Sequence, residues 1–240
     1  MGSTEGFAWS SEAVSHVGTV RKVNEDSCLD RPEKGLWVVA DGMGGHAAGD
    51  VASQAITAAL DEMPAADSLA QLADQVERCL RDVNTRLVKL AEDSEKQTIG
   101  STVSVMIARN SHAICIWAGD SRVYRLRKGT LEQLTQDHAM VEDMVDVGLI
   151  SQEEAEHHPQ ANRITRAIGA APEVFVDMDI FELQKGDRFL LCSDGLYKEL
   201  QPADITKILK GRGNRAKAGV DLALDRGARD NVTVITVTIN

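Results

Sequence analysis

Hydrophobic positions along the chain change their period several times, and each period predicts a type of element. The run 35–40 is apolar throughout, which is typical of a strand buried on both faces. Two stretches with apolar residues at every third or fourth position follow, over 47–63 and 68–91, and they predict two consecutive helices. Asp67 stands directly before the second stretch and is a candidate helix N-cap.

The rest of the chain reads mainly as short strands separated by polar turns. These predicted strands cover residues 101–108, 112–118, 123–126, 130–134, 174–183, 187–192 and 231–239. The stretch 137–168 is polar and helical in period, and two short helices are expected after Pro202. Strands joined by short turns pair antiparallel, so the pattern predicts an α+β fold of antiparallel sheets covered by helices. No linker or internal repeat divides residues 1–240, and we expect a single domain.

Composition and charge narrow the class of protein. Hydrophobic residues make up 43% and charged residues 26%, the ordinary mixture of a globular protein. The net charge of −11 argues against nucleic acid as the main partner, because clustered basic residues hold phosphate backbones. It does not argue against a phosphorylated substrate, since bound cations can reverse the sign of the charge locally.

The four cysteines and the N-terminus indicate the cellular compartment. No cysteine pair has CxxC spacing, so neither a zinc knuckle nor a disulfide framework is indicated, and we expect buried thiols in a reducing compartment. The N-terminus lacks the basic and apolar regions of a secretory signal. No apolar run approaches the about 20 residues of a membrane span. We therefore expect a cytoplasmic protein that is monomeric and does not associate with membranes.

Carboxylates fall repeatedly at the ends of the predicted strands. They are Asp41, Asp120 and Asp194 after strands, Asp230 before the last strand, and Glu25 with Asp26 before a short run at 27–29. One such Asp is usually a turn residue or a helix cap, but so many at strand ends indicate one acidic site. Oxygen ligands without clustered Cys or His select Mg²⁺ or Mn²⁺ over zinc. Two such ions sharing a carboxylate activate water and offset the charge of a phosphoryl group.

Seven short motifs follow one another along the chain. They are RxxxED at 21–26, VADGMGGH at 39–46, GST at 100–102, AGDSR at 118–122, LTxDH at 134–138, CSDGL at 192–196 and RDNVT at 229–233. In this order they resemble the motifs of the PP2C (PPM) family, the metal-dependent protein serine/threonine phosphatases, in its compact bacterial form. The resemblance implies a four-layer αββα sandwich, with two antiparallel sheets between helices and a flap at about 137–170.

The resemblance also implies a role for each matching residue. Asp41 would bridge two core metal ions, the Gly42 carbonyl would ligate one of them, and Asp194 and Asp230 would complete the other. The remaining positions are Glu25 and Asp26, which would hold metal-bound waters, and Asp120, which would contribute to a third, weaker ion.

Arg21 and His46 are the candidates for binding the phosphate and for donating a proton to the leaving oxygen. A guanidinium makes a bidentate contact to two phosphate oxygens, and the alternative for Arg21 is a surface ion pair with Glu25. His46 would donate a proton to the leaving oxygen, and its alternative is a residue that packs against the loop. The histidines of the flap read as structural or surface residues: His138, His157 and His158.

The resemblance implies hydrolysis of phosphoserine and phosphothreonine by metal-activated water, in a phosphatase that opposes a eukaryotic-like Ser/Thr kinase. The substrate would be a phosphoprotein, either the kinase or its target. A serine hydrolase is disfavoured because Ser193 lacks the GxSxG context, and no P-loop lysine follows the 42–45 glycines. The alternative is a catalytically silent domain that binds a phosphoprotein or partner. Such a domain would lack Asp41, Asp194 or Asp230, and all three are present. A phosphatase of small metabolites is a lesser alternative.

Lys198 departs from the family pattern. Many members carry another Asp four residues after the position of Asp194, where it helps to hold the third metal. If a helical turn starts at Asp194, the i,i+4 spacing turns Lys198 toward that carboxylate. An ammonium repels a metal ion, so we expect the site at Asp120 to be weak. The alternative is that Lys198 points into solvent.

Overall fold

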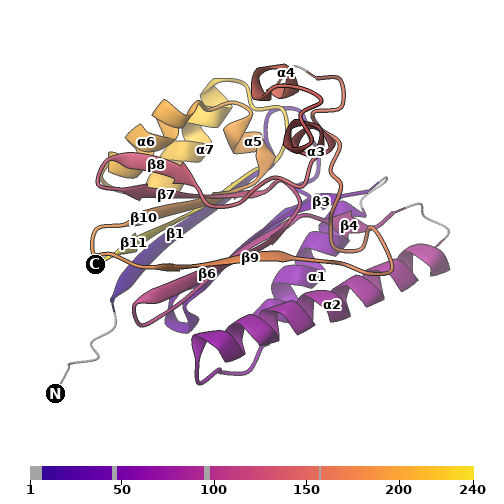
Figure 1. Cartoon of the computed structure of the whole chain (residues 1–240), viewed down its shortest axis with the longest axis horizontal. Coiled ribbons are helices and arrows are strands. Elements are labelled where there is room, and N and C mark those ends of the chain that lie inside the picture. The colour runs from indigo at the N-terminus through magenta and orange to yellow at the C-terminus, as the bar shows by residue number, and fades with distance from the viewer. Residues whose placement is uncertain (1–6, 45–47, 95–97, 157) are drawn as a thin grey trace.

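The computed structural model describes residues 7–44, 48–94, 98–156 and 158–240, whose strands form two antiparallel sheets. In spatial order the first sheet holds β1 (Trp9–His16), β11 (Val232–Ile239), β10 (Arg188–Cys192), β7 (Arg122–Arg127) and β8 (Thr130–Gln133). The second holds β2 (Asp26–Arg31), β3 (Leu36–Met43), β5 (Val103–Arg109), β6 (His112–Ala118) and β9 (Asp177–Glu182), with β4 (Gly100–Ser101) paired to β3. The sheets lie face to face (Figure 1).

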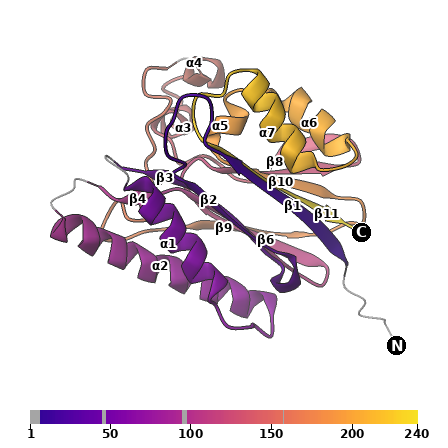
Figure 2. The same cartoon turned by 180° about the vertical axis from the view of Figure 1, so that it is seen from behind.

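Helices cover the outer face of each sheet, as both views of the ribbon show (Figures 1 and 2). The second sheet is covered by α1 (Gly49–Asp61) and α2 (Leu69–Asp93), and the 3-10 turn η1 (Pro32–Lys34) joins β2 to β3. The first sheet is covered by α5 (Asp194–Tyr197), α6 (Pro202–Lys210) and α7 (Arg215–Asp225). This arrangement confirms the predicted α+β sandwich of two antiparallel sheets flanked by helices.

Three apolar layers hold the sandwich together. β11 shows why its residues form a central strand: Val232 and Val234 pack toward the helices, and Ile235 and Val237 pack toward the other sheet. The layer between the sheets also contains Trp37, which is fully buried. Burial on both faces explains why near-continuous apolar runs mark the central strands in the sequence.

The insert between β8 and β9 differs from its prediction. Where the structure describes the polar stretch 137–168, it forms two short helices, α3 (Met140–Asp146) and α4 (Gln152–Glu156), and no longer one. Their cluster of buried apolar residues is small and consists of Ala139, Val141 and Ala155. Too few apolar side chains are available in this insert to support a longer helix.

Three local predictions need correction. Ser68, not Asp67, caps α2, because its Oγ accepts the N–H of Gln71 at 3.1 Å. β3 continues to Met43, so Asp41 and Gly42 lie inside the strand and not after it. β1 escaped prediction because most of its residues are only half-buried, so its apolar pattern is weak.

None of the helices in the described ranges combines the length and apolarity of a membrane span.

Candidate active site

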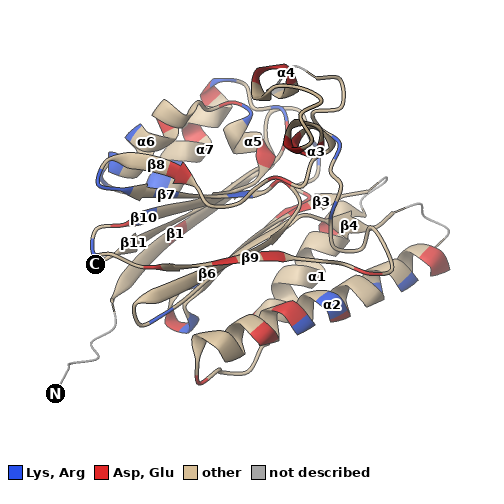
Figure 3. Ribbon diagram, viewed as in Figure 1, with Lys and Arg blue, Asp and Glu red and all other residues tan. Residues whose placement is uncertain are grey.

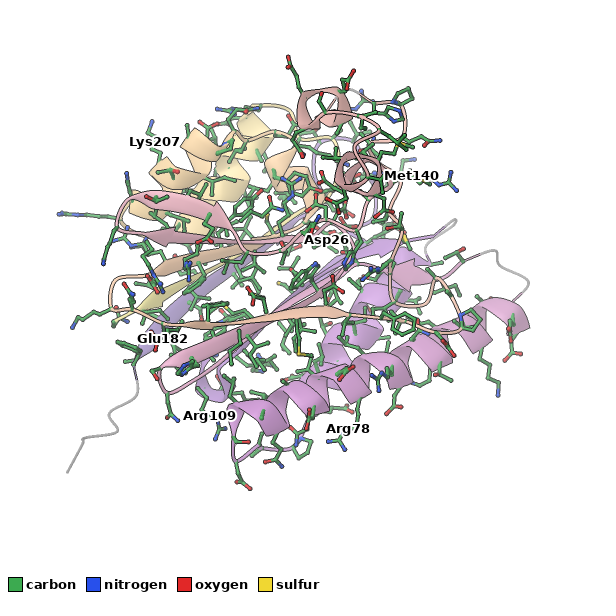
Figure 4. The ribbon with its side chains drawn as sticks, in the orientation of Figure 1. Asp26, Arg78, Arg109, Met140, Glu182 and Lys207 are labelled. Carbon is green, nitrogen blue, oxygen red and sulfur yellow. The ribbon has the colours of Figure 1, made fainter. Side chains whose placement is uncertain are left out.

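The predicted carboxylates come together at one end of the sandwich, where strands of both sheets meet. Asp26 begins β2 and lies opposite Asp41 of β3 in the strand register. Asp194 begins α5 directly after β10, and Asp230 precedes β11. Figure 4 labels Asp26 between the two sheets, on the side of Met140 in the insert. Strand register therefore brings together residues that are far apart in the sequence.

Asp26 is buried, with 7% of its surface exposed, and is held by two hydroxyl groups. Thr233 Oγ1 and Ser193 Oγ donate to Asp26 Oδ2 at 2.6 and 2.8 Å. Burial raises the pKa of Asp26 to about 7, although these two hydrogen bonds lower it. Ser193 Oγ also accepts the N–H of Thr233 at 3.0 Å, so the same contacts join the ends of β10 and β11. Sequence reasoning quoted Ser193 and Thr233 inside motifs without giving either a role.

Asp41 and Gly42 are fixed through their backbone. The Asp41 carbonyl accepts the N–H of Thr102 at 2.9 Å, and the Gly42 N–H donates to the Glu25 carbonyl at 3.1 Å. A Cβ at Gly42 would lie 2.1 Å from the Gly49 carbonyl oxygen, so only glycine allows α1 to approach β3 this closely. Burial raises the pKa of the Asp41 carboxyl well above its usual value, and the neighbouring carboxylates raise it further.

Asn231 holds the loop that carries Arg21 and Glu25. Its Oδ1 accepts the Glu25 N–H at 2.7 Å, and its Nδ2 donates to the carbonyls of Val17 at 2.9 Å and Val23 at 3.1 Å. The side chain is buried, so these three bonds satisfy most of its polar groups inside the protein. Sequence reasoning missed this positioning role of Asn231. The one feature in the sequence that could have indicated it is the position of Asn231 directly after Asp230.

Two cations already contact candidate metal ligands. Lys198 Nζ donates to Asp194 Oδ2 at 2.6 Å, so the alternative that Lys198 points into solvent is wrong. Desolvation lowers the pKa of Lys198, but the carboxylates of Asp194, Asp120 and Asp41 together outweigh it, and the net shift is upward. Arg21 Nη2 donates to Asp230 Oδ2 at 2.8 Å, so its ion pair is with Asp230 and not with Glu25. Both cations line a pocket of about 450 Å³.

Asp120 follows β6 and lies beside α5. Tyr197 OH donates to Asp120 Oδ2 at 3.1 Å, and the guanidinium of Arg122 lies 3.6 Å from the centre of the Tyr197 ring. Burial raises the pKa of Asp120 to about 6, and the charge of Asp194 adds to the shift. Asp120 therefore shares the acidic centre. His46, the expected proton donor, lies outside the described residues, as His157 does.

The donor set fits hard divalent cations. Within the described parts of the chain, no three His, Cys, Asp or Glu side chains are arranged around a single point that could hold one ion. Asp194 and Asp230 instead each accept a hydrogen bond from a side-chain cation, which marks the positions where positive charge is needed. Carboxylates and a backbone carbonyl are the oxygen ligands that Mg²⁺ and Mn²⁺ prefer. The residues present therefore suit such ions.

Comparison with known proteins decides the family. A family model described as "Protein phosphatase 2C" matches residues 15–218. The chain belongs to the protein phosphatase 2C family. The serine/threonine phosphatase stp of Listeria welshimeri is 35% identical over 93% of this chain and 93% of its own length. This membership confirms the resemblance and shows that the chain is a protein serine/threonine phosphatase, as the motifs predicted.

Solved structures of this family share the fold. PppA, described as a key regulatory component of T6SS in Pseudomonas aeruginosa, is 42% identical with a TM-score of 0.92, covering 98% of this chain and 99% of PppA. The catalytic domain of PstP, in complex with two manganese ions, is 36% identical with a TM-score of 0.84, covering 97% of this chain and 99% of that domain. Protein phosphatases 2C of known structure thus superpose on nearly the whole chain.

Proposed function

We propose that this protein hydrolyses phosphoserine and phosphothreonine in proteins at a binuclear Mn²⁺ or Mg²⁺ centre, and that it opposes a Ser/Thr kinase. One observation carries the proposal. Asp26, which is buried, and Asp41, which is half-buried, lie opposite each other in β2 and β3. Asp194, Asp120 and Asp230 are close enough to raise the pKa of Asp41. So much negative charge in one place needs multivalent cations. The similarity of this chain to a PstP domain in complex with two manganese ions supports manganese as the metal here.

The residues divide into metal ligands and residues that hold water. We assign Asp41 as the shared carboxylate, with the Gly42 carbonyl, Asp194 and Asp230 as further ligands of the two core ions. Glu25 and Asp26 would hold metal-bound waters, and Asp120 would serve a third, weaker ion. When bound, the ions supply an activated water and offset charge on the phosphoryl group. We further propose that residues 1–240 act as one monomeric domain with residues 137–170 as its flap.

Arg21 and His46 act on the substrate itself. The Arg21 side chain is half-exposed and lines the pocket beside Asp230, so its guanidinium can move from that carboxylate to two phosphate oxygens. The guanidinium would be free for this movement if a metal ion took its place as the counter-charge of Asp230. His46 donates a proton to the seryl or threonyl oxygen as it leaves.

Turnover with and without metal tests the proposal. Purified protein should hydrolyse an aryl phosphate and a phosphothreonine peptide with Mn²⁺, and should lose both activities in EDTA. A protein that binds the phosphopeptide but hydrolyses neither substrate at any Mn²⁺ concentration would instead be the silent binding domain. A kinase autophosphorylated on Ser or Thr, used as substrate, tests the opposing role separately.

Two substitutions separate the work of Arg21 from that of His46. Arg21→Ala should raise KM for the phosphopeptide more than it lowers kcat, because the clamp binds ground and transition states alike. His46→Ala should lower kcat for the phosphopeptide, and less for an aryl phosphate, whose leaving group hardly needs a proton. Equal slowing of both substrates by His46→Ala would show that His46 is not the proton donor.

A further inference from the structure

Among the strands of the described residues, β9 lies at the edge of the second sheet and pairs with β6 alone. The hydrogen-bond pattern shows which of its backbone groups are engaged. Leu183 N–H donates to the Ser111 carbonyl at 2.8 Å, and Glu182 lies opposite His112 in the register. Hydrogen-bonded and non-bonded pairs alternate in an antiparallel ladder, so Met178, Ile180 and Glu182 turn their N–H and C=O groups away from β6.

Within the described ranges, one of these outward groups has a hydrogen-bond partner. The Glu182 carbonyl accepts a hydrogen bond from Arg127 Nη2 at 2.7 Å, which agrees with its direction away from β6. The outward groups of Met178 and Ile180, together with the Glu182 N–H, form the open part of the edge. Such a row is a template for one more strand.

The side chains along this edge are unusually apolar for a surface. Phe175, Met178 and Ile180 are 69%, 47% and 60% exposed. Met178 and Ile180 project to the same face of the sheet, because they are two positions apart in a strand. A groove of about 340 Å³, which Phe175 helps to line, lies between α2 and residues 172–176, just before β9 in the chain. Apolar side chains of an added strand would pack on Met178 and Ile180, and one could enter the groove.

Charge indicates what kind of strand fits. Glu173, Asp179 and Glu182 are exposed around the apolar residues, and Figure 3 shows acidic positions along β9. Asp179 and Glu182 lie on opposite faces of the strand, so an added strand meets negative charge on both faces. A second copy of this chain would place its own Asp179 diagonally across from this one, and its net charge of −11 would add to the repulsion.

We propose that the open edge of β9 is a docking site for an extended segment of a partner protein in which apolar residues alternate with Lys or Arg. The segment adds a strand to the second sheet through the backbone of Met178, Ile180 and Glu182. β9 and β2, which carries Asp26, are the two opposite edge strands of the second sheet. The inference therefore does not depend on the proposed metal chemistry.

The probe is a short labelled peptide in which valine alternates with lysine and arginine. Its binding to the full protein is followed by fluorescence anisotropy and by amide hydrogen exchange. The expected result is saturable binding that slows exchange of the Met178, Ile180 and Glu182 amides. The same peptide with N-methylated backbone amides carries equal charge but cannot pair, and should bind at least about tenfold more weakly.

Ile180→Pro tests the geometry from the protein side. Because the Ile180 N–H points away from β6, proline removes an open donor without breaking the bonds between β6 and β9. Peptide affinity should fall about tenfold, whereas Ile180→Val, which keeps the N–H, should bind like the natural protein. Circular dichroism reports that both variants are folded.

Three results would overturn the proposal. The first is peptide binding without slowed exchange at Met178 and Ile180 in the natural protein, a measurement that needs no variant to fold. The second is equal affinity for the normal and the N-methylated peptide, which would mean attraction by charge alone. The third is a concentration-dependent dimer in sedimentation that Ile180→Pro abolishes, which would assign the edge to a second copy of this chain.

Discussion

At the scale of single residues, the acidic centre depends on which positive or polar group each carboxylate meets. Lys198 and Arg21 contact Asp194 and Asp230, whereas hydroxyl groups hold Asp26. The sequence indicated the carboxylates because each lies at or near the end of a predicted strand. It could not indicate the contacts of Ser193 or Asn231, because these depend on which strands become neighbours, and no local pattern contains that information.

Asp41→Asn tests the central ligand. The substitution keeps the shape of the side chain and removes its charge, so Mn²⁺ affinity should fall by more than about 100-fold, since loss of a group that only supports a ligand costs about 10–100-fold. Turnover should fall with it, while circular dichroism remains that of the folded protein. Affinity is measured by isothermal titration calorimetry. A folded variant with near-normal affinity and turnover would contradict the shared-ligand role of Asp41.

Lys198→Asp tests the ion pair beside Asp194. The ammonium repels a nearby divalent ion by about 1–4 kcal/mol at ~4 Å, so its replacement should lower the Mn²⁺ concentration for full activity by at least about fivefold. Lys185→Asp makes the same change of charge at an exposed position far from the site and is the control. An unchanged metal titration in Lys198→Asp, with a shifted one in Asp120→Ala, would show that Lys198 plays no part in the third site.

At the scale of elements, the strength of the apolar pattern decided what the sequence could predict. α2 was evident because it buries a continuous stripe of apolar residues along one side. β11 was evident because it is buried on both faces. β1 was not predicted, since its half-buried residues leave a weak pattern. The end of β3 was placed too early because Asp41 resembles a turn residue, and only pairing with β2 and β4 shows that the strand continues.

Ser68→Ala tests the corrected start of α2. Removing the hydroxyl leaves the Gln71 N–H without its capping acceptor, so the free energy of unfolding should fall by about 1 kcal/mol. Asp67→Ala is the matched control next to it and should change stability much less. Urea unfolding at equilibrium measures both. Equal losses in the two variants would restore Asp67 as a contributor to the cap.

At the scale of the whole molecule, His138 connects the flap (residues 137–170) to β6 and to β9, which are separate in the sequence. The ring Nδ1 of His138 accepts the backbone N–H of Gly119, which directly follows β6. The backbone N–H of His138 donates to the Gly119 carbonyl. On its other side Nε2 lies 3.1 Å from Asp177 Oδ2 at the start of β9. The ring stacks on Trp117. The flap is thereby attached to both strands next to Asp120, and the interpretation of His138 as a structural residue agrees with these contacts.

These contacts predict a specific dependence of stability on pH. Burial lowers the pKa of His138, the nearby Arg166 lowers it further, and Asp177 and Asp137 act in the opposite direction without reversing the shift. Protonation also requires a hydrogen on Nδ1, which accepts the Gly119 N–H. A histidine whose pKa is lower in the folded state stabilises the fold fully above its unfolded pKa of about 6.5, and that stability is lost as the pH falls below it. Asp177, whose pKa is also lowered, adds a loss only in more acidic solution.

Unfolding in urea at several pH values checks this dependence. Between about pH 7 and about pH 5, the free energy of unfolding should fall more steeply in the natural protein than in His138→Gln, which cannot take up the proton. His112→Gln removes an exposed histidine and should keep the slope of the natural protein. If His138→Gln and the natural protein lose stability in parallel, then protonation of His138 does not oppose folding. The neutral imidazole would in that case not be what attaches the flap, which would depend on its other contacts, such as the backbone bond of His138 to Gly119 and the ion pair of Arg166 with Asp177 at 2.7 Å.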